Sequence, residues 1–187
     1  MSSFTGIFTS FGLSTSAGLN AYLPLLIVAL VSRFTKLIQL NEPFDALSSW
    51  WSISVLVVLT AIEILADKIP AVDSINDVLQ TFVRPVAGAV LFAANTNAIA
   101  DIHPVLAMIC GLLISGTVHV VKSAARPVVT ASTAGVGNPI VSTAEDIVSA
   151  ATAFLAILLP TLLALVLLLA VAIIGWWLWK RQQRKSV

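Results

Sequence analysis

Long apolar runs dominate this sequence and restrict what it can fold into. The longest extends from residue 147 to residue 179 and is interrupted only by Pro160. Of the whole chain, 58% is hydrophobic and only 10% is charged. Soluble domains carry about a quarter charged residues. A water-soluble fold does not fit this composition, and we expect an integral membrane protein.

The apolar runs predict an all-α, polytopic protein with about five transmembrane helices, one or two of them broken or re-entrant. The four spans before the longest run are expected at 6–32, 52–66, 84–99 and 105–121. A short amphipathic helix is expected at 72–82, ahead of the third span, and Arg84-Pro85 is expected to begin or kink that span. Residues 1–180 then form a single transmembrane domain, and residues 181–187 form a basic cytoplasmic tail.

The C-terminal end of the longest run carries the signals that set orientation. An aromatic belt is followed directly by basic residues: Trp176, Trp177, Trp179, then Lys180, Arg181, Arg184, Lys185. Lys and Arg residues next to a membrane span are more frequent on its cytoplasmic side, and Trp residues are more frequent at the membrane–water interface. Five crossings with the N-terminus outside would also place Arg33 and Lys36 on the cytoplasmic side, which agrees with the same rule. The alternative is four crossings with re-entrant pieces.

The first segment does not read as one straight span. The first half of the segment is rich in small and polar residues, and the second half is apolar. Pro24 removes a helix hydrogen bond. We therefore expect a broken or re-entrant entry followed by a helix.

The stretch 119–146 separates two apolar runs and contains a Gly/Ser/Thr/Pro segment. Residues 132–138 (STAGVGN) are similar to residues 14–20 (STSAGLN), and each stretch has a proline close by. Transporters often contain weak internal repeats whose broken helices meet near the bilayer midplane, where helix N-termini bind anions. We therefore expect 132–139 to be packed within the protein at membrane depth. The alternatives are a loop outside the membrane and a chance likeness.

Two charged stripes suggest a shared site. Glu63 and Asp67 are four residues apart, and so are Lys122 and Arg126, with His119 one turn earlier. Residues four apart share a helix face. Both stripes are expected to stop at a proline, Pro70 and Pro127. Charges inside a membrane segment usually face a partner or a water-filled cavity, so we expect the stripes to meet.

The alternative is that these charges reach to the interface as ordinary surface residues. For Lys68 and Arg84 we favour this alternative. For Glu63 and His119 we favour the site, because each lies well inside an apolar run.

The candidate substrate-binding residues combine the stripes, the paired acids and the two asparagines of the similar segments. Lys122 and Arg126 would balance an anion or an acidic partner. Glu63 and His119 would couple proton movement to solute transport, since both residue types can titrate near neutral pH when buried. The full set is Asn20, Glu63, Asp67, His119, Lys122, Arg126, Asn138, Glu145 and Asp146.

The sequence gives little support for a metal site, a nucleotide site, a nucleic-acid interface or a lipid-phosphate phosphatase. His103 and His119 lack the neighbours of a zinc site, the glycines do not form a nucleotide fingerprint, and no basic patch suits nucleic acid. We therefore expect neither metal nor cofactor. Residues 122–127 (KSAARP) resemble the opening of the membrane lipid-phosphate phosphatase motif. However, no histidine follows His119, so the nucleophile of that class is missing.

The chain as a whole resembles a family of small bacterial inner-membrane proteins catalogued as a domain of unknown function. The segments that carry this resemblance are GLNAYLPLL, ADKIPAVD, KSAARPVVTASTAGVGNP and STAED. The resemblance implies a multi-pass protein of the bacterial inner membrane and implies no activity.

The sequence favours transport or permeation of a small solute, with an anion as the candidate class. The alternatives are a membrane-embedded enzyme acting on a lipid or lipid phosphate, and a structural or assembly protein. Membrane lipid is an expected partner in each case. A chain this small encloses little volume, which suits a homodimer under each of these interpretations.

Overall fold

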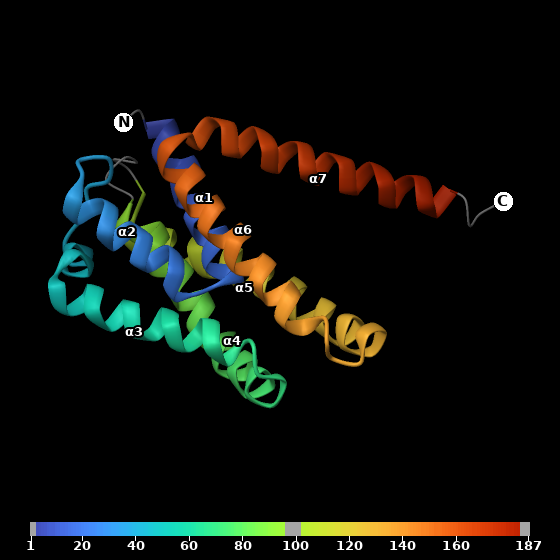
Figure 1. Cartoon of the computed structure of the whole chain (residues 1–187). Coiled ribbons are helices and arrows are strands. Elements are labelled where there is room, and N and C mark those ends of the chain that lie inside the picture. The colour runs from blue at the N-terminus through green and yellow to red at the C-terminus, as the bar shows by residue number, and fades with distance from the viewer. Residues whose placement is uncertain (1–2, 96–101, 184–187) are drawn as a thin grey trace.

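The computed structural model describes residues 3–95 and 102–183, which form α-helices and no strand (Figure 1). The expected end of the third span, within 96–101, and Arg184 and Lys185 of the tail lie outside the described residues. The elements are α1 (Ser3–Leu19), α2 (Tyr22–Phe34), the short 3₁₀ helix η1 (Phe44–Ser48), α3 (Trp50–Ala66), α4 (Pro70–Ala94), α5 (Pro104–Thr133), α6 (Asn138–Leu158) and α7 (Pro160–Gln183).

The all-α, polytopic prediction is confirmed. Three helices are long and apolar enough to cross a membrane: Asn76–Ala94 of α4, α5 and α6. Shorter apolar helices are α2, α3 and the segment Leu168–Trp177. Large apolar side chains are exposed along these helices, as expected for surfaces that face lipid. The count of about five spans stays a prediction.

The first segment is broken, as predicted, but Pro24 does not cause the break. α1 ends at Leu19 and α2 begins at Tyr22, so Asn20 and Ala21 form the break. Pro24 lies in the first turn of α2, where a missing N–H costs little because no intrahelical acceptor is available there.

Two predicted helix boundaries are wrong. The 72–82 helix and the third span form one continuous helix, α4, with Pro85 inside it. Likewise α5 continues through Pro127, so the basic stripe does not stop at that proline. Each proline removes only one backbone hydrogen bond, and tertiary packing can outweigh that loss. The acidic stripe does end where predicted, since α3 stops at Ala66 and α4 starts at Pro70.

The expectation that 132–139 is packed within the protein is also wrong. Residues 134–137 form the turn between α5 and α6, and Ser132, Thr133 and Val136 are exposed, although Asn138 at the start of α6 is buried. Ala134 and Gly135 have φ of 51° and 85°, the left-handed conformation that ends many helices. Residues 14–19 are helical instead, so the similarity of the two segments does not extend to their conformation.

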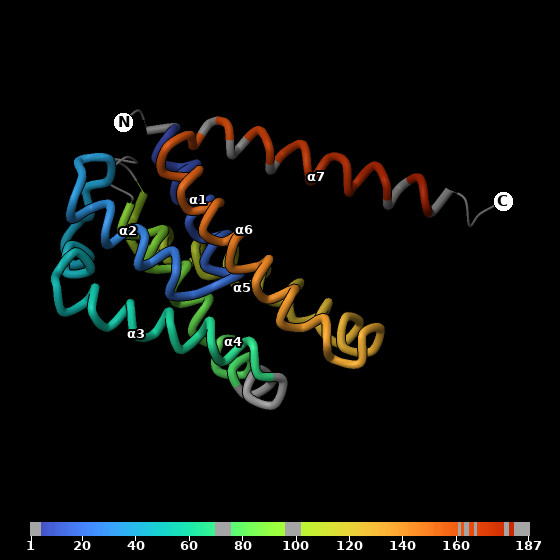
Figure 2. The backbone as a smooth tube through the Cα atoms, viewed as in Figure 1, coloured from blue at the N-terminus to red at the C-terminus, as the bar shows by residue number. Residues whose placement is uncertain are grey.

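α1 runs through the middle of the bundle and contacts α4, α5, α6 and α7 (Figure 2). Small residues allow a close crossing of α1, α4 and α5. A Cβ added to Gly88 would overlap Ser115, one added to Gly111 would overlap the backbone of Gly88, and one on Gly18 would lie 2.5 Å from Val118 Cβ. Ser14 Oγ also donates to Gly88 O at 2.9 Å. This crossing brings α4 and α5 together beside the break between α1 and α2.

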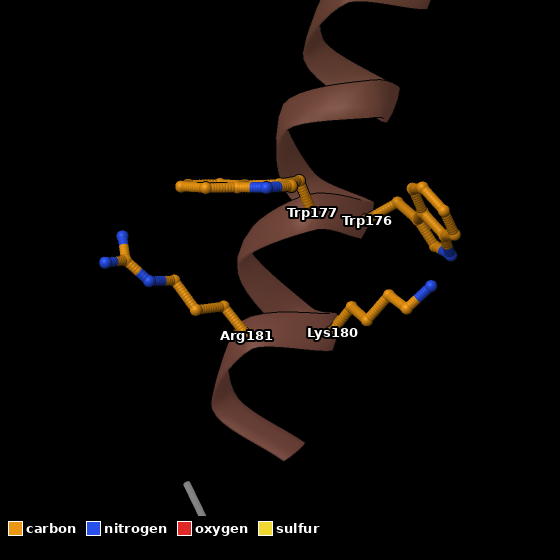
Figure 3. Close-up of a pocket in the computed structure, with 4 residues that line it drawn as sticks. All are labelled: Trp176, Trp177, Lys180 and Arg181. Carbon is orange, nitrogen blue, oxygen red and sulfur yellow. The ribbon is translucent and has the colours of Figure 1, made fainter. Parts of the chain in front are cut away.

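α7 extends away from the other helices (Figure 1). Its C-terminal end pairs cations with tryptophan rings. Lys180 Nζ lies 4.9 Å from the Trp176 ring centre, and Arg181 Cζ lies 5.0 Å from that of Trp177 (Figure 3). Cations stacked on exposed indole rings suit the polar side of a membrane interface.

Candidate functional site

Charged residues gather where five segments meet: the α1–α2 break, the end of α3, the first half of α4, the middle of α5 and the start of α6. The cluster contains five of the chain's nine acidic residues and four of its ten basic residues. We call it the charge cluster; its members are Glu63, Lys68, Asp67, Asp77, Arg84, Lys122, Arg126, Glu145 and Asp146, with His119 and Asn20 bonded to them.

The innermost pair of the charge cluster is Glu63 with Arg84. Arg84 Nη2 lies 3.2 Å from Glu63 Oε1, and both side chains are 0% exposed. Arg84 Nη1 also lies 3.0 Å from His119 Nδ1. Ion pairs this deep in a membrane protein require good geometry, because removing two charges from water costs several kcal/mol per ion.

The contacts of His119 define its protonation. Arginine can only donate, so His119 Nδ1 must accept the bond from Arg84 and carry no proton. The proton then sits on Nε2, which lies 3.0 Å from Thr81 Oγ1. That hydroxyl already donates to the Asp77 carbonyl at 2.9 Å, so it accepts from His119. In this arrangement the imidazole is neutral.

Asp67 forms the middle of the charge cluster. Its Oδ2 lies 3.7 Å from Arg126 Nη2 and 3.9 Å from both Arg84 Nη2 and Lys122 Nζ. Asn76 donates to its other oxygen at 2.7 Å. Asp67 is therefore shared by three cations, and the predicted meeting of the acidic and basic stripes is confirmed.

The outer part of the charge cluster is partly exposed. Glu145 Oε2 lies 2.9 Å from Lys122 Nζ and 3.2 Å from Arg126 Nη2, and its side chain is 16% exposed. Asp77, 3.9 Å from Arg126 Nη1, is 22% exposed. Lys68, 4.0 Å from Asp146, is 37% exposed. Exposure thus rises from the Glu63–Arg84 pair towards the α3–α4 turn and the start of α6.

The two helix ends at the α1–α2 break each meet a charge of the opposite sign. Glu63 accepts from the N–H groups of Ala21 and Tyr22 at 3.2 and 3.3 Å, at the start of α2. Lys122 Nζ donates to the Leu19 carbonyl at 2.9 Å, at the end of α1. Helix N-termini carry partial positive charge and C-termini partial negative charge, so both contacts are favourable.

Asn20 connects the break to α6. Its Oδ1 accepts from Leu23 N–H at 2.9 Å, and its Nδ2 donates to Asp146 Oδ1 at 2.9 Å. An Asn that accepts from the N–H three residues later acts as a helix cap. One side chain therefore caps α2 and holds Asp146.

Eight of the nine predicted site residues meet in the charge cluster; Asn138 does not. It bonds to Thr130 at the α5–α6 turn. Sequence reasoning missed Asp77 and misassigned Arg84, which lies at the centre rather than at the interface. The spacing of Asp77, Gln80 and Arg84 along one helix face was the available signal, obscured by the assumed helix boundary at Arg84-Pro85.

No group of three or more His, Cys, Asp or Glu residues in the described part of the chain is arranged to hold a metal ion. The acids of the charge cluster instead face cations of the chain. The arrangement can bind a small charged solute or transfer protons between neighbouring groups.

Fold and site together define a polytopic helical membrane protein with a buried cluster of ion pairs at a broken helix. The chain belongs to the family described as "Domain of unknown function (DUF4126)", whose family model matches residues 7–181. Neither a curated protein nor a solved structure matches the chain.

Proposed function

We propose that the protein moves a small solute across its membrane through the charge cluster. The supporting observation is the change in exposure across that cluster: the side chains of Glu63 and Arg84 are 0% exposed, whereas those of Asp77 and Glu145 are 22% and 16% exposed. A transport site must reach water on at least one side and must hold its charges away from lipid on the other.

A purely mechanical role gives no reason for so many buried charges. Well-packed apolar residues often hold helices together as well as a buried ion pair does, or better. Ionisable groups inside membrane segments usually mark ion or substrate pathways. The proposal further places the protein in the bacterial inner membrane, with the basic end of α7 in the cytoplasm.

The test is solute flux in liposomes of phosphatidylethanolamine and phosphatidylglycerol that contain the purified full-length protein. Separate arms follow chloride, nitrate, formate, sodium, potassium and glycerol. We expect at least one solute to pass faster than through protein-free liposomes. Arg126→Gln should slow it about 10-fold or more, since a charge-assisted hydrogen bond contributes about 1.5–3 kcal/mol.

Arg33→Gln is the matched control, because Arg33 is exposed and bonds to Ser48 O outside the charge cluster. Its flux should equal that of the unmodified protein. If no solute passes faster than through protein-free liposomes, the transport proposal fails. The second candidate, a structural role for the charge cluster, would then be favoured by the complete burial of Glu63 and Arg84.

A further inference from the structure

The Glu63 carboxylate occupies a site with the donors that a free anion needs. Two backbone N–H groups at the start of α2, those of Ala21 and Tyr22, donate to it at 3.2 and 3.3 Å. Arg84 Nη2 donates at 3.2 Å. Backbone N–H groups at a helix N-terminus together with a guanidinium are a common way to bind an anion in a protein. Here the bound anion is a side chain of the chain itself.

The site has more donors than Glu63 uses. Arg84 is 0% exposed, yet its Nε has no hydrogen-bond partner among the described residues. A buried donor without a partner costs about 1–3 kcal/mol, so this N–H is available to a ligand that enters the site. The guanidinium therefore supplies a second, independent indication of anion binding beside the start of α2.

We infer that this site binds a small monovalent anion, such as chloride, nitrate or formate, when a protonated Glu63 side chain leaves it. The inference rests on the proposed function and names its substrate class. One proton forms an O–H bond on the Glu63 carboxyl group, and one anion takes its place on the N–H donors. Both come from water on the exposed side of the charge cluster, and the net charge of the cluster does not change.

This charge balance is the physical reason for competition between Glu63 and the anion. An added anion beside an ionised Glu63 would introduce an uncompensated buried charge, which is very costly in a low-dielectric site. Protonation alone would leave Arg84 without its closest anion. The two events together avoid both costs, so anion entry and proton uptake are coupled.

The groups around Glu63 determine where the proton can go. His119 is held neutral by Arg84 with its proton on Nε2, so it does not accept the proton in this arrangement. Lys122 faces the Leu19 carbonyl at the opposite helix end. The charged and titratable groups of the packed elements are Tyr22 from α2, Asp67 at the end of α3, Asp77 and Arg84 from α4, His119, Lys122 and Arg126 from α5, and Glu145 and Asp146 from α6.

The test measures anion binding through thermal unfolding of the purified full-length protein in detergent. Sodium chloride, nitrate or formate replaces sodium gluconate at constant ionic strength. Glu63→Gln removes the competing charge and keeps the side-chain size. We expect chloride to raise its unfolding midpoint by about 3–6 °C at ten times the dissociation constant. The unmodified protein should show a smaller rise at pH 8 and a larger one at pH 5.5.

Glu145→Gln is the matched control, since Glu145 pairs with Lys122 and Arg126 but not with the start of α2. Chloride should raise its midpoint no more than that of the unmodified protein. An equal rise in Glu63→Gln and Glu145→Gln would overturn the inference, because it would indicate general charge compensation. If Glu63→Gln does not fold, the unmodified protein carries the test, and no chloride effect at either pH would overturn the inference.

The outcome separates the two proposals. Flux of a cation or of glycerol in liposomes, without anion stabilisation, would overturn the anion site and keep the transport function. Chloride stabilisation of Glu63→Gln without flux of any solute would support the anion site and refute transport.

Discussion

Asp67 is the residue on which the stability of the charge cluster depends most. Three cations from two helices lie within 3.9 Å of its Oδ2, and Ser142 Oγ donates to the same atom at 3.3 Å. Removing its charge would leave several buried cations with less compensation. Arg126 would lose its partner at the middle of the cluster but would keep Glu145.

A double-mutant cycle tests this sharing. We expect Asp67→Asn and Arg126→Gln each to lower the free energy of unfolding by up to about 3–5 kcal/mol, the cost of a fully unpartnered buried charge, because each leaves its buried neighbours with less charge compensation. The double variant should lose less than the sum, since it removes both members of the pair. Denaturant unfolding in detergent measures the free energies of unfolding of the two single variants and the double variant.

The control for this cycle is Asp45→Asn. Asp45 is exposed within η1, so the change should shift the free energy of unfolding by no more than about 0.5 kcal/mol. Additive losses in the double variant would show that Asp67 and Arg126 do not interact energetically.

At the scale of helices, the α4–α5 crossing positions Arg84 and His119. Ser115 Oγ donates to the Arg84 carbonyl at 2.5 Å, one turn from His119 on α5. The close approach depends on Gly88 and Gly111, because a methyl group at either would overlap the facing helix. Small residues at membrane helix contacts allow such approaches.

Gly88→Ala should therefore separate α4 from α5 and destabilise the protein by about 1–3 kcal/mol, the usual cost of overpacking. Gly175→Ala in α7 is the matched control, since nothing lies within 4 Å of a Cβ added there. It should be neutral or stabilising by up to about 1 kcal/mol through helix propensity. Thermal unfolding measures the stability of both variants. Equal stabilities of Gly88→Ala and Gly175→Ala would contradict a tight crossing of α4 and α5.

A second prediction at this scale concerns the direction of α7. Lys180 and Arg181 stack on Trp176 and Trp177 at its end, so we expect this end on the cytoplasmic side (Figure 3). A phosphatase reporter that is active only in the periplasm should be inactive when fused after Val187, and a fluorescent reporter that folds in the cytoplasm should be bright. The opposite pattern would reverse the orientation.

For the whole molecule, the main feature is that the exposure of the described side chains in the charge cluster rises from its inner pair towards its outer members. Its inner pair touches the broken helix at the centre of the bundle, while its outer members lie near the α3–α4 turn and the start of α6. Water and solute would therefore approach from that side in this conformation. Under the transport proposal, a second conformation must give access from the other side.

Cysteine labelling in membranes tests this direction. We expect Glu145→Cys to react quickly with a small, charged, membrane-impermeant thiol reagent, and Thr60→Cys to react at least about tenfold more slowly, because Thr60 is 6% exposed. Both are made in a Cys110→Ala background, since Cys110 is exposed. Equal rates, or no labelling of Glu145→Cys, would contradict an opening on that side.

The sequence alone determined the class of protein and most of the site. Apolar runs must be helical in lipid, because every backbone group there needs an internal partner. Charges at helical spacing inside such runs must find partners, and so the meeting of the Glu63–Asp67 and Lys122–Arg126 stripes was predictable. The break before Tyr22 was likewise visible in a segment that changes from polar to apolar.

Only the tertiary structure decided which residue lies at the centre. Arg84 precedes a proline, and local reasoning placed a helix boundary there, whereas packing against α1 and α5 keeps α4 continuous. The same holds for Pro127 within α5 and for the exposed turn at 134–137. A proline or a glycine changes the local free energy by a few kcal/mol at most, and contacts between distant helices outweigh that amount.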